Sequence, residues 1–208
     1  MSMEKQATIG LVDDDEGMLR ALGRLLRTHG YAVRTFDSPD RFLMEHLHAD
    51  LHCVVLDVSM PGCNGLELQE YLNRSDKPLP IIFLSGEGNI PISVRAMKAG
   101  AVTFLVKPVE EQVLLEAIAT ALEQSDSKQS QRDELDSLRS RLERLTTRER
   151  EVLEHVISGK PNKLIAADLG LSIQTVKVHR MQVTKKLEIP SVAGLVSAAN
   201  QLGVVPAA

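Results

Sequence analysis

Asp57 ends a largely apolar run that begins at Leu51, and the chain then passes through a loop that contains Pro61 and Gly62. Such a run is typical of a buried parallel strand that leads into a loop. We therefore expect Asp57 at the carboxyl end of a central strand, the edge at which open α/β sheets bind ligands. A single acid there is most often a loop cap, so any chemistry depends on the other side chains that reach this edge.

Four more polar residues follow expected strands elsewhere in the chain. Asp13 and Asp14 come after the first strand, Ser85 follows the fourth, and Lys107 follows the fifth. Because the carboxyl ends of parallel strands meet at one edge, these residues are expected to share a pocket with Asp57. The pocket would then hold three carboxylates, a hydroxyl group and an ammonium group.

This set of groups favours a bound cation and phosphoryl chemistry. Carboxylates about 5 Å apart repel each other by about 3 kcal/mol at an effective dielectric constant of about 20. Oxygen ligands on rigid loops suit Mg²⁺, which binds one or two carboxylates together with waters and a phosphate. A carboxylate beside the metal can attack a phosphoryl group and form an acyl phosphate. Lys107 and Ser85 would donate hydrogen bonds to the phosphoryl oxygens.

Strands and helices alternate through the first 122 residues, and these elements must hold the pocket. Five such repeats predict an α/β doubly wound (βα)5 parallel-sheet domain with helices on both faces. Strands are expected at residues 7–12, 31–36, 51–57, 80–84 and 102–106, and helices at 18–30, from 38 onward, 66–72, 90–99 and 109–122.

Composition and charge indicate two domains with different partners. The 208 residues are 43% apolar and 25% charged, which is ordinary for a soluble globular protein. Residues 1–122 carry 11 Lys and Arg against 17 Asp and Glu, whereas residues 145–208 carry 8 against 5. The mildly basic back part is therefore a candidate for binding a polyanion. No apolar run approaches the roughly 18 residues of a membrane span, so we expect a cytoplasmic protein with no membrane partner.

Two cysteines form neither a metal-ligand nor a redox pattern. Cys53 lies within the expected third strand and is interpreted as a small core residue. Cys63 lies in the loop after Asp57, where a redox role is the alternative to an ordinary loop residue.

The segment between the two halves leaves two structures open. Residues 123–134 contain no apolar residue, glycine or proline, so they form either a solvated extension of the preceding helix or a flexible tether. Leu135, Leu138, Leu142 and Leu145 then recur at 3-4-3 spacing, which fits a short coiled coil or a helix that packs on its neighbour. The predicted divisions are residues 1–122 for the front domain, 123–144 for a helical linker and 145–208 for the back domain.

The back domain is expected to be an all-α four-helix unit of helix-turn-helix type. Gly170 stops the second helix and Ser172 is a good N-cap for the third, so a short helix, a glycine turn and a longer helix follow one another. Helices are expected at about residues 152–157, 164–169, 173–187 and 191–202.

The third of these helices has two distinct faces. Val176, Val183 and Leu187 share one face and are expected to pack inward. The opposite stripe consists of Gln174, Lys177, Val178, Met181 and Lys185. A polar stripe is often only a solvated surface, but the apolar residues within this one suit contacts with thymine methyl groups.

Several motifs of the front domain resemble the receiver domain of two-component response regulators. These motifs are Asp13-Asp14, Asp57 with Met60-Pro61-Gly62, Ser85-Gly86, and residues 104–108 ending in Lys107-Pro108. The resemblance implies that Asp57 is the phosphoacceptor for a sensor histidine kinase. It also implies that Asp14, Asp57 and the Ser59 carbonyl hold Mg²⁺ directly, and that Asp13 acts through water. Ser85 and Phe104 resemble the switch pair of the family, with serine where threonine is commoner.

The back domain resembles the LuxR-type DNA-binding domain in residues 145–153, 162–163 and 175–180. Together the two resemblances indicate the NarL/FixJ class of response regulators. By this resemblance Lys177, Val178 and Met181 face the major groove, although Met181 stands where a polar residue is expected. The implied DNA backbone contacts are Asn162, Lys163, Arg180 and Lys185. The last helix is interpreted as a dimer contact or simply as part of the core.

We therefore expect a phosphorylation-activated transcription regulator rather than an enzyme, and an activator rather than a repressor. It would dimerise on phosphorylation and bind double-stranded DNA, with RNA polymerase as a further partner. One alternative is a Mg²⁺-dependent phosphatase resembling the haloacid dehalogenases, but those place the nucleophile and the acid two residues apart on the first strand. A second alternative is a receiver that dimerises without phosphorylation.

Overall fold

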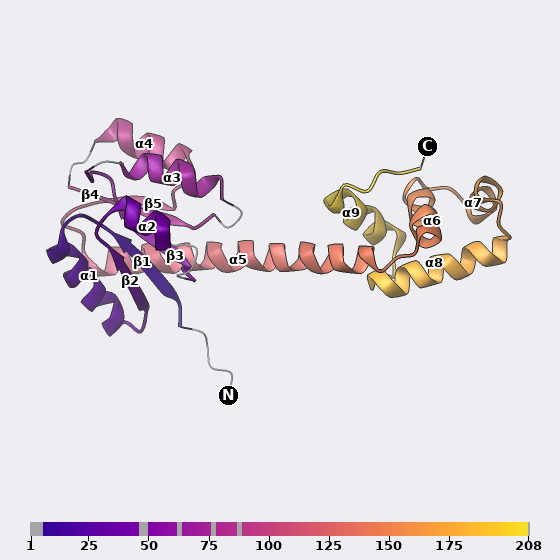
Figure 1. The fold of residues 1–208 in the computed structure, drawn as a ribbon, viewed down its shortest axis with the longest axis horizontal. Coiled ribbons are helices and arrows are strands. Elements are labelled where there is room, and N and C mark those ends of the chain that lie inside the picture. The colour runs from indigo at the N-terminus through magenta and orange to yellow at the C-terminus, as the bar shows by residue number, and fades with distance from the viewer. Residues whose placement is uncertain (1–5, 46–49, 62–63, 76–77, 87–88, 208) are drawn as a thin grey trace. The chain divides into compact units, whose positions relative to one another are not determined.

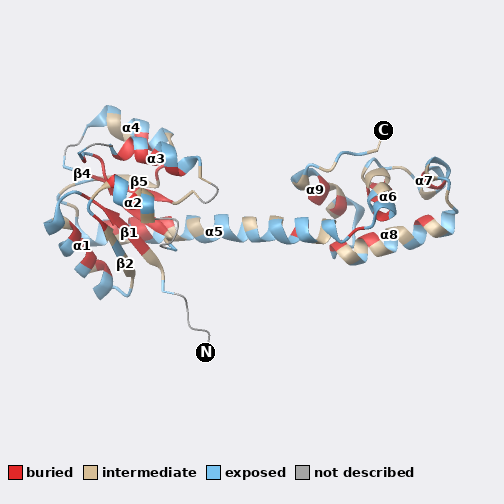
Figure 2. Cartoon of the chain, in the orientation of Figure 1, coloured by how far each residue is buried: buried red, intermediate tan, exposed pale blue. Residues whose placement is uncertain are grey.

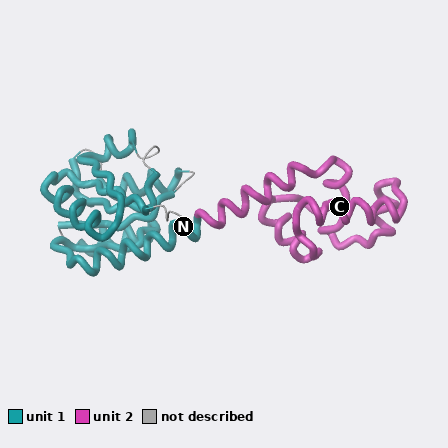
Figure 3. Tube along the Cα trace, turned by 90° about the horizontal axis from the view of Figure 1, so that it is seen from below, with its two compact units in different colours: residues 1–128 teal, residues 129–208 magenta. Residues whose placement is uncertain are grey.

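The computed structural model describes residues 6–45, 50–61, 64–75, 78–86 and 89–207. Within it the chain divides into two compact units, residues 1–128 and 129–208 (Figure 3). No helix of the described residues is long and apolar enough to cross a membrane.

A five-stranded, fully parallel sheet forms the centre of the first unit (Figure 1). The strand order is β2-β1-β3-β4-β5, so the strand that ends at Asp57 lies in the middle. The strands are β1 (Thr8–Val12), β2 (Ala32–Phe36), β3 (Cys53–Asp57), β4 (Ile81–Ser85) and β5 (Thr103–Val106). The predicted doubly wound α/β fold is confirmed, with strand ends that differ from those expected by one or two residues.

The first four helices of this unit each connect consecutive parallel strands, and the fifth follows β5. They are α1 (Glu16–Thr28), α2 (Pro39–Glu45), α3 (Gly65–Asn73), α4 (Ile90–Lys98) and the beginning of α5 (Glu111–Glu143). Asp15 caps α1, because its side chain accepts hydrogen bonds from the backbone N–H groups of Gly17 and Met18.

The core lies on both faces of the sheet, and β3 and β4 are buried along their whole length (Figure 2). One apolar cluster lies on each face, because side chains alternate between the faces along each strand. Cys53 is fully buried, and burial raises the pKa of its thiol to about 12. Its prediction as a core residue is confirmed, whereas Cys63 lies outside the described residues.

Helix α5 continues to Glu143, although its apolar face predicted an end near Leu122. Of the two structures left open for residues 123–134, the structure has the helical extension. Leu138 and Leu145 are buried, and Leu142 packs against the core of the second unit. Three of the four leucines at 3-4-3 spacing therefore pack inside this chain.

The second unit adds four helices to the end of α5. They are α6 (Thr147–Ile157), α7 (Asn162–Leu169), α8 (Ile173–Leu187) and α9 (Val192–Leu202). Gly170 ends α7 in the left-handed conformation, and the Ser172 hydroxyl accepts a hydrogen bond from the Thr175 N–H at the start of α8. The predicted all-α unit with a short helix, a glycine turn and a longer capped helix is confirmed.

Candidate functional site

The carboxyl ends of β1, β3 and β4 bring three polar side chains to one edge of the sheet. Asp13 is 5% exposed, Asp57 is 6% exposed and Ser85 is 4% exposed. These residues come from neighbouring strands, because β3 pairs with β1 on one side and with β4 on the other. The shared pocket predicted from the sequence therefore has a structural basis in the strand order.

Lys107, which follows β5, joins two of these acids. Its Nζ atom lies 2.7 Å from Oδ2 of Asp13 and 2.8 Å from Oδ1 of Asp57. Burial lowers the pKa of Lys107, but the hydrogen bonds to Asp13 and Asp57 outweigh it and raise the pKa above its ordinary value. The lysine is thus held in its charged form between two carboxylates.

Backbone N–H groups orient the other oxygen of each carboxylate. Oδ2 of Asp57 accepts a hydrogen bond from the Ser59 N–H at 2.8 Å, and Oδ1 of Asp13 accepts one from the Asp15 N–H at 2.9 Å. Each carboxylate therefore accepts a hydrogen bond from Lys107 at one oxygen and from a backbone N–H two residues later in the chain at the other. This arrangement fixes both side-chain orientations before any ligand binds.

Gly65 allows α3 to begin close behind the end of β3. A Cβ atom at this position would collide with the carbonyl oxygen of Asp57 and lie 3.0 Å from the Phe83 ring. The N–H of Gly65 also donates a hydrogen bond to the carbonyl of Val58 at 3.0 Å. Sequence reasoning missed this residue; the signal available was a glycine that directly follows a capping residue, Asn64.

The donor set of the pocket fits a hard divalent cation. The described residues contain no group of three or more Asp, Glu, His or Cys side chains arranged to hold a metal. Mg²⁺ needs fewer protein ligands, since one or two carboxylates suffice when waters and a phosphate complete the shell. Asp13 and Asp57 each place one oxygen on the same ammonium group, so the two carboxylates lie close enough to share one cation. Asp14 and Ser59, which follow Asp13 and Asp57 by one and two residues in the sequence, are exposed.

The predicted switch pair lies on β4 and β5. The carbonyl of Ser85 accepts a hydrogen bond from the Lys107 N–H at 2.7 Å, which ties the two strand ends together. Phe104 is partly buried against the core cluster on its face of the sheet. Its ring centroid lies 6.1 Å from that of Phe83, with 34° between the ring planes. Glu87, an acid near this site in sequence, lies outside the described residues.

Helix α8 of the second unit has the two faces predicted from its sequence. Val176, Val183 and Leu187 are buried in the core of that unit. The opposite stripe of Gln174, Lys177, Val178, Met181 and Lys185 is exposed. Val178 is 44% exposed and Met181 is 57% exposed, so this stripe presents apolar surface between two lysines.

Two of the residues expected to contact a DNA backbone are bonded to each other. Nη1 of Arg180 donates a hydrogen bond to Oδ1 of Asn162 at 2.6 Å. This bond joins the first turn of α7 to the middle of α8 and holds the guanidinium in place. Lys163, the next residue of α7, is exposed.

Comparisons with known protein families agree with this architecture. Residues 9–119 match the response regulator receiver domain, and residues 143–199 match the luxR family of bacterial regulatory proteins. The receiver match covers nearly the whole sheet, and the luxR match contains α6, α7 and α8.

Two relatives align with nearly the whole chain. The chain is 40% identical to the response regulator protein TmoT of Ectopseudomonas mendocina over 96% of this chain and 90% of that protein. It is 38% identical to the transcriptional regulatory protein FixJ of Azorhizobium caulinodans over 99% of this chain and 97% of that protein.

Two solved structures extend over nearly the whole chain. The response regulator StyR is 45% identical with a TM-score of 0.81, and the match covers 95% of this chain and 100% of that one. Full-length FixJ from B. japonicum is 36% identical with a TM-score of 0.59, and it covers 97% of this chain and 99% of that one. With a receiver-type pocket, an exposed helix-turn-helix stripe and these relatives, the chain belongs to the two-component response regulators of the NarL/FixJ class and is a transcription regulator with a LuxR-type DNA-binding domain.

Proposed function

We propose that Asp57 is the phosphoacceptor of this regulator and that its partner is a sensor histidine kinase. The observation that carries the proposal is the position of Asp57, which ends the central strand with one carboxylate oxygen on Lys107 and the other on the Ser59 N–H. Of the two acids that contact Lys107, Asp57 is the one in the middle of the sheet edge.

In the proposed step, a carboxylate oxygen of Asp57 attacks the phosphorus atom of a phosphohistidine on the kinase. A bond forms between this oxygen and phosphorus, the bond between phosphorus and the histidine nitrogen breaks, and the nitrogen keeps the electron pair. Lys107 moves from the Asp57 oxygen to an oxygen of the phosphoryl group while it keeps its contact with Asp13. Positioning and charge neutralisation of this kind account for most of the catalysis of phosphoryl transfer.

Asp14, Asp57 and the Ser59 carbonyl would hold Mg²⁺ directly, and Asp13 would act through a bound water. When it is bound, Mg²⁺ supplies positive charge to the carboxylates and to the phosphoryl oxygens. Ser85 would donate its hydroxyl hydrogen to the phosphoryl group, and the ring of Phe104 would turn inward in the same transition. Because this ring is only partly buried in the present state, the turn would bury more of it.

In the second unit, α8 is the proposed recognition helix. Gln174, Lys177, Val178 and Met181 would face base edges in the major groove, and Asn162, Lys163, Arg180 and Lys185 would contact phosphates. The activated chain would bind double-stranded DNA as a homodimer in the cytoplasm and act on RNA polymerase as an activator. Charge supports the proposed DNA contacts. Four of the contact residues, namely Lys163, Lys177, Arg180 and Lys185, are basic, whereas the receiver is acidic.

Sedimentation and DNA binding with and without an acyl-phosphate mimic test the proposal. We expect beryllofluoride with Mg²⁺ to convert the chain from monomer to dimer and to increase its affinity for a duplex that the chain selects from a random library. Asp57→Asn should abolish both effects, whereas Asp50→Asn, which removes an acid outside the pocket, should leave both intact. Dimerisation that is the same with and without the mimic would instead favour a receiver that works without phosphorylation.

A further inference from the structure

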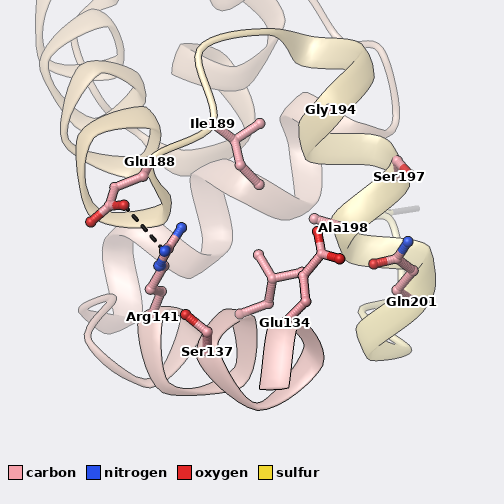
Figure 4. Close-up of a pocket in the computed structure, with 10 residues that line it drawn as sticks. Glu134, Ser137, Arg141, Glu188, Ile189, Gly194, Ser197, Ala198 and Gln201 are labelled. Atoms are coloured by element: carbon pink, nitrogen blue, oxygen red, sulfur yellow. Dashed lines mark ion pairs between the residues drawn. The ribbon is translucent and has the colours of Figure 1, made fainter. Parts of the chain in front are cut away.

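The C-terminal end of α8 is held by the last turns of α5. Nη1 of Arg141 donates a hydrogen bond to the carbonyl of Leu187 at 3.2 Å, and Nη2 lies 3.2 Å from Oε2 of Glu188. Glu188 caps α8 in the left-handed conformation, with φ of 58°. Figure 4 shows the Arg141 side chain extending from α5 to this cap.

The contact satisfies two needs of a helix end at once. The last carbonyl groups of a helix have no partner inside the helix, and the helix dipole places negative charge there. A guanidinium group offers several donors in a fixed plane and keeps its charge at any physiological pH. Arg141 is therefore well suited to fix both the position and the direction of the end of α8.

A second contact, from a lysine, holds the same end of α8 to the next corner of the chain. Nζ of Lys186 lies 2.6 Å from Oε2 of Glu149 and 3.2 Å from the carbonyl of Arg144. Glu149 is itself buried and forms a capping box with Thr146 at the start of α6. The end of α8 is thus joined both to α5 and to the corner between α5 and α6.

Packing beside Arg141 is incomplete. The position of the α8 end on this side therefore depends on the hydrogen bond and the ion pair that Arg141 makes. A groove of about 470 Å³ separates α5 from α9 and from the α8–α9 connection. Arg141 and Glu188 line this groove together with Ile189 and small residues of α9 (Figure 4). The neighbouring leucines of α5, Leu138 and Leu142, are buried or packed on the core of the unit, but their apolar side chains cannot bond the α8 carbonyl.

We propose that Arg141 is a positioning residue for DNA recognition, through which the end of α5 sets the placement of the recognition helix. Lys177, Val178 and Met181, which are proposed to face bases, lie on the same helix, so a shift of its end changes their placement as well. Displacement of α8 within the major groove of DNA then weakens contacts to bases more than contacts to phosphates, because base contacts depend more strongly on geometry. The inference rests on the proposed use of α8 as the recognition helix.

The test compares arginine variants of α5 in the full chain activated with beryllofluoride and Mg²⁺. Arg141→Met keeps the apolar stem but removes the charge and the donors, and it should weaken binding to the selected duplex about five- to tenfold. Arg141→Lys keeps the charge but not the planar pair of donors, so it should restore only part of this loss. Arg139→Met is the matched control, since Arg139 lies on the same helix, is exposed and pairs with Asp136 nearby; it should change affinity less than twofold.

The dependence of binding on salt separates a positioning role from a direct DNA contact. Loss of a phosphate contact reduces the slope of log affinity against log salt by about 1, whereas Arg141→Met should leave the slope as in Arg139→Met. The double variant Arg141→Met with Glu188→Gln should lose no more affinity than Arg141→Met alone. Unchanged affinity, a reduced slope, or an equal loss on unrelated duplexes would overturn the inference. If the unaltered chain selects no duplex at all, the proposed function itself fails.

Discussion

The ammonium nitrogen of Lys107 lies 2.8 Å from Oδ1 of Asp57, across 50 positions of sequence. The same nitrogen contacts Asp13, so one cation holds two buried carboxylates at the edge of the sheet. Their mutual repulsion is largest when this charge is absent. The ammonium group therefore has a structural role in the resting receiver as well as its proposed role in phosphoryl binding.

Lys107→Met should lower the free energy of unfolding of the receiver by about 2 kcal/mol, because two buried acids lose a charged hydrogen-bond partner. Tyrosine fluorescence during urea unfolding measures this, since both tyrosines of the chain, Tyr31 and Tyr71, lie in the first unit. Lys98→Met, on the exposed surface of α4, is the control and should change stability by less than about 0.5 kcal/mol. Equal stability of the two variants would refute the structural role.

Asp14→Asn should weaken Mg²⁺ binding by about ten- to a hundredfold, because a proposed direct ligand is lost. Titration calorimetry with MgCl₂ measures the affinity. The matched control is Asp15→Asn, which removes the same charge one residue away but keeps the α1 cap, since asparagine caps helices as well as aspartate does. If both variants bind Mg²⁺ alike, only long-range charge matters and the ligand assignment is wrong.

Lys177→Ala should weaken the free energy of binding to the selected duplex by about 1–3 kcal/mol. It should also relax the sequence preference of the chain at one base position. Lys163→Ala should weaken binding to all duplexes by a similar factor and lower the salt slope by about 1. The two exposed lysines thus give opposite signatures if one reads a base and the other a phosphate. A uniform loss for Lys177→Ala, with a lower slope, would make Lys177 a phosphate contact.

Glu149→Gln should destabilise the second unit in a pH-dependent way. Burial raises the pKa of Glu149, but hydrogen bonds from Lys186 and from Thr146 outweigh it and lower the pKa below its ordinary value. The charged form is thus stabilised in the folded state. Its contribution is fully present above the carboxyl pKa of the unfolded chain, about 4.3, and is lost as pH falls through the lower folded value.

Hydrogen exchange of peptides from α6 and α8 measures local stability in Glu149→Gln and in the unaltered chain at each pH. Protection should be lower in Glu149→Gln at pH 7, by an amount equivalent to about 1 kcal/mol, and the difference should shrink below pH of about 4.3. The control is Glu151→Gln, whose carboxylate is more exposed and pairs with Arg148. A difference between Glu149→Gln and the unaltered chain that grows on acidification would contradict the sign of this linkage.

The sequence predicted the parts of the fold that depend on local pattern. Apolar runs located all five strands, and the rules for connecting parallel strands were enough to predict that Asp13, Asp57 and Lys107 meet at one edge. The inward face of α8 followed from helical spacing in the same way, and Val176 and Val183 are buried as expected.

Features that depend on packing between distant segments were not visible in the sequence. The end of α5 could not be fixed, because residues 123–134 have no apolar face and their helical state does not follow from composition. Gly65 and Arg141 escaped notice for a related reason, since their roles arise from the backbone of Asp57 and from the end of α8. The bond from Arg180 to Asn162 likewise joins side chains whose spacing of 18 residues suggests no contact.

Detection of an acyl phosphate on Asp57 directly tests whether this residue is the phosphoacceptor. The unaltered chain, incubated with Mg²⁺ and acetyl phosphate, should gain one phosphoryl group, and peptide mass spectrometry after borohydride reduction should locate the modification at Asp57. We expect Asp57→Asn to gain none, whereas Asp13→Asn keeps the acceptor and retains a measurable fraction. Phosphorylation of Asp57→Asn to the same extent as the unaltered chain would show that Asp57 is not the phosphoacceptor.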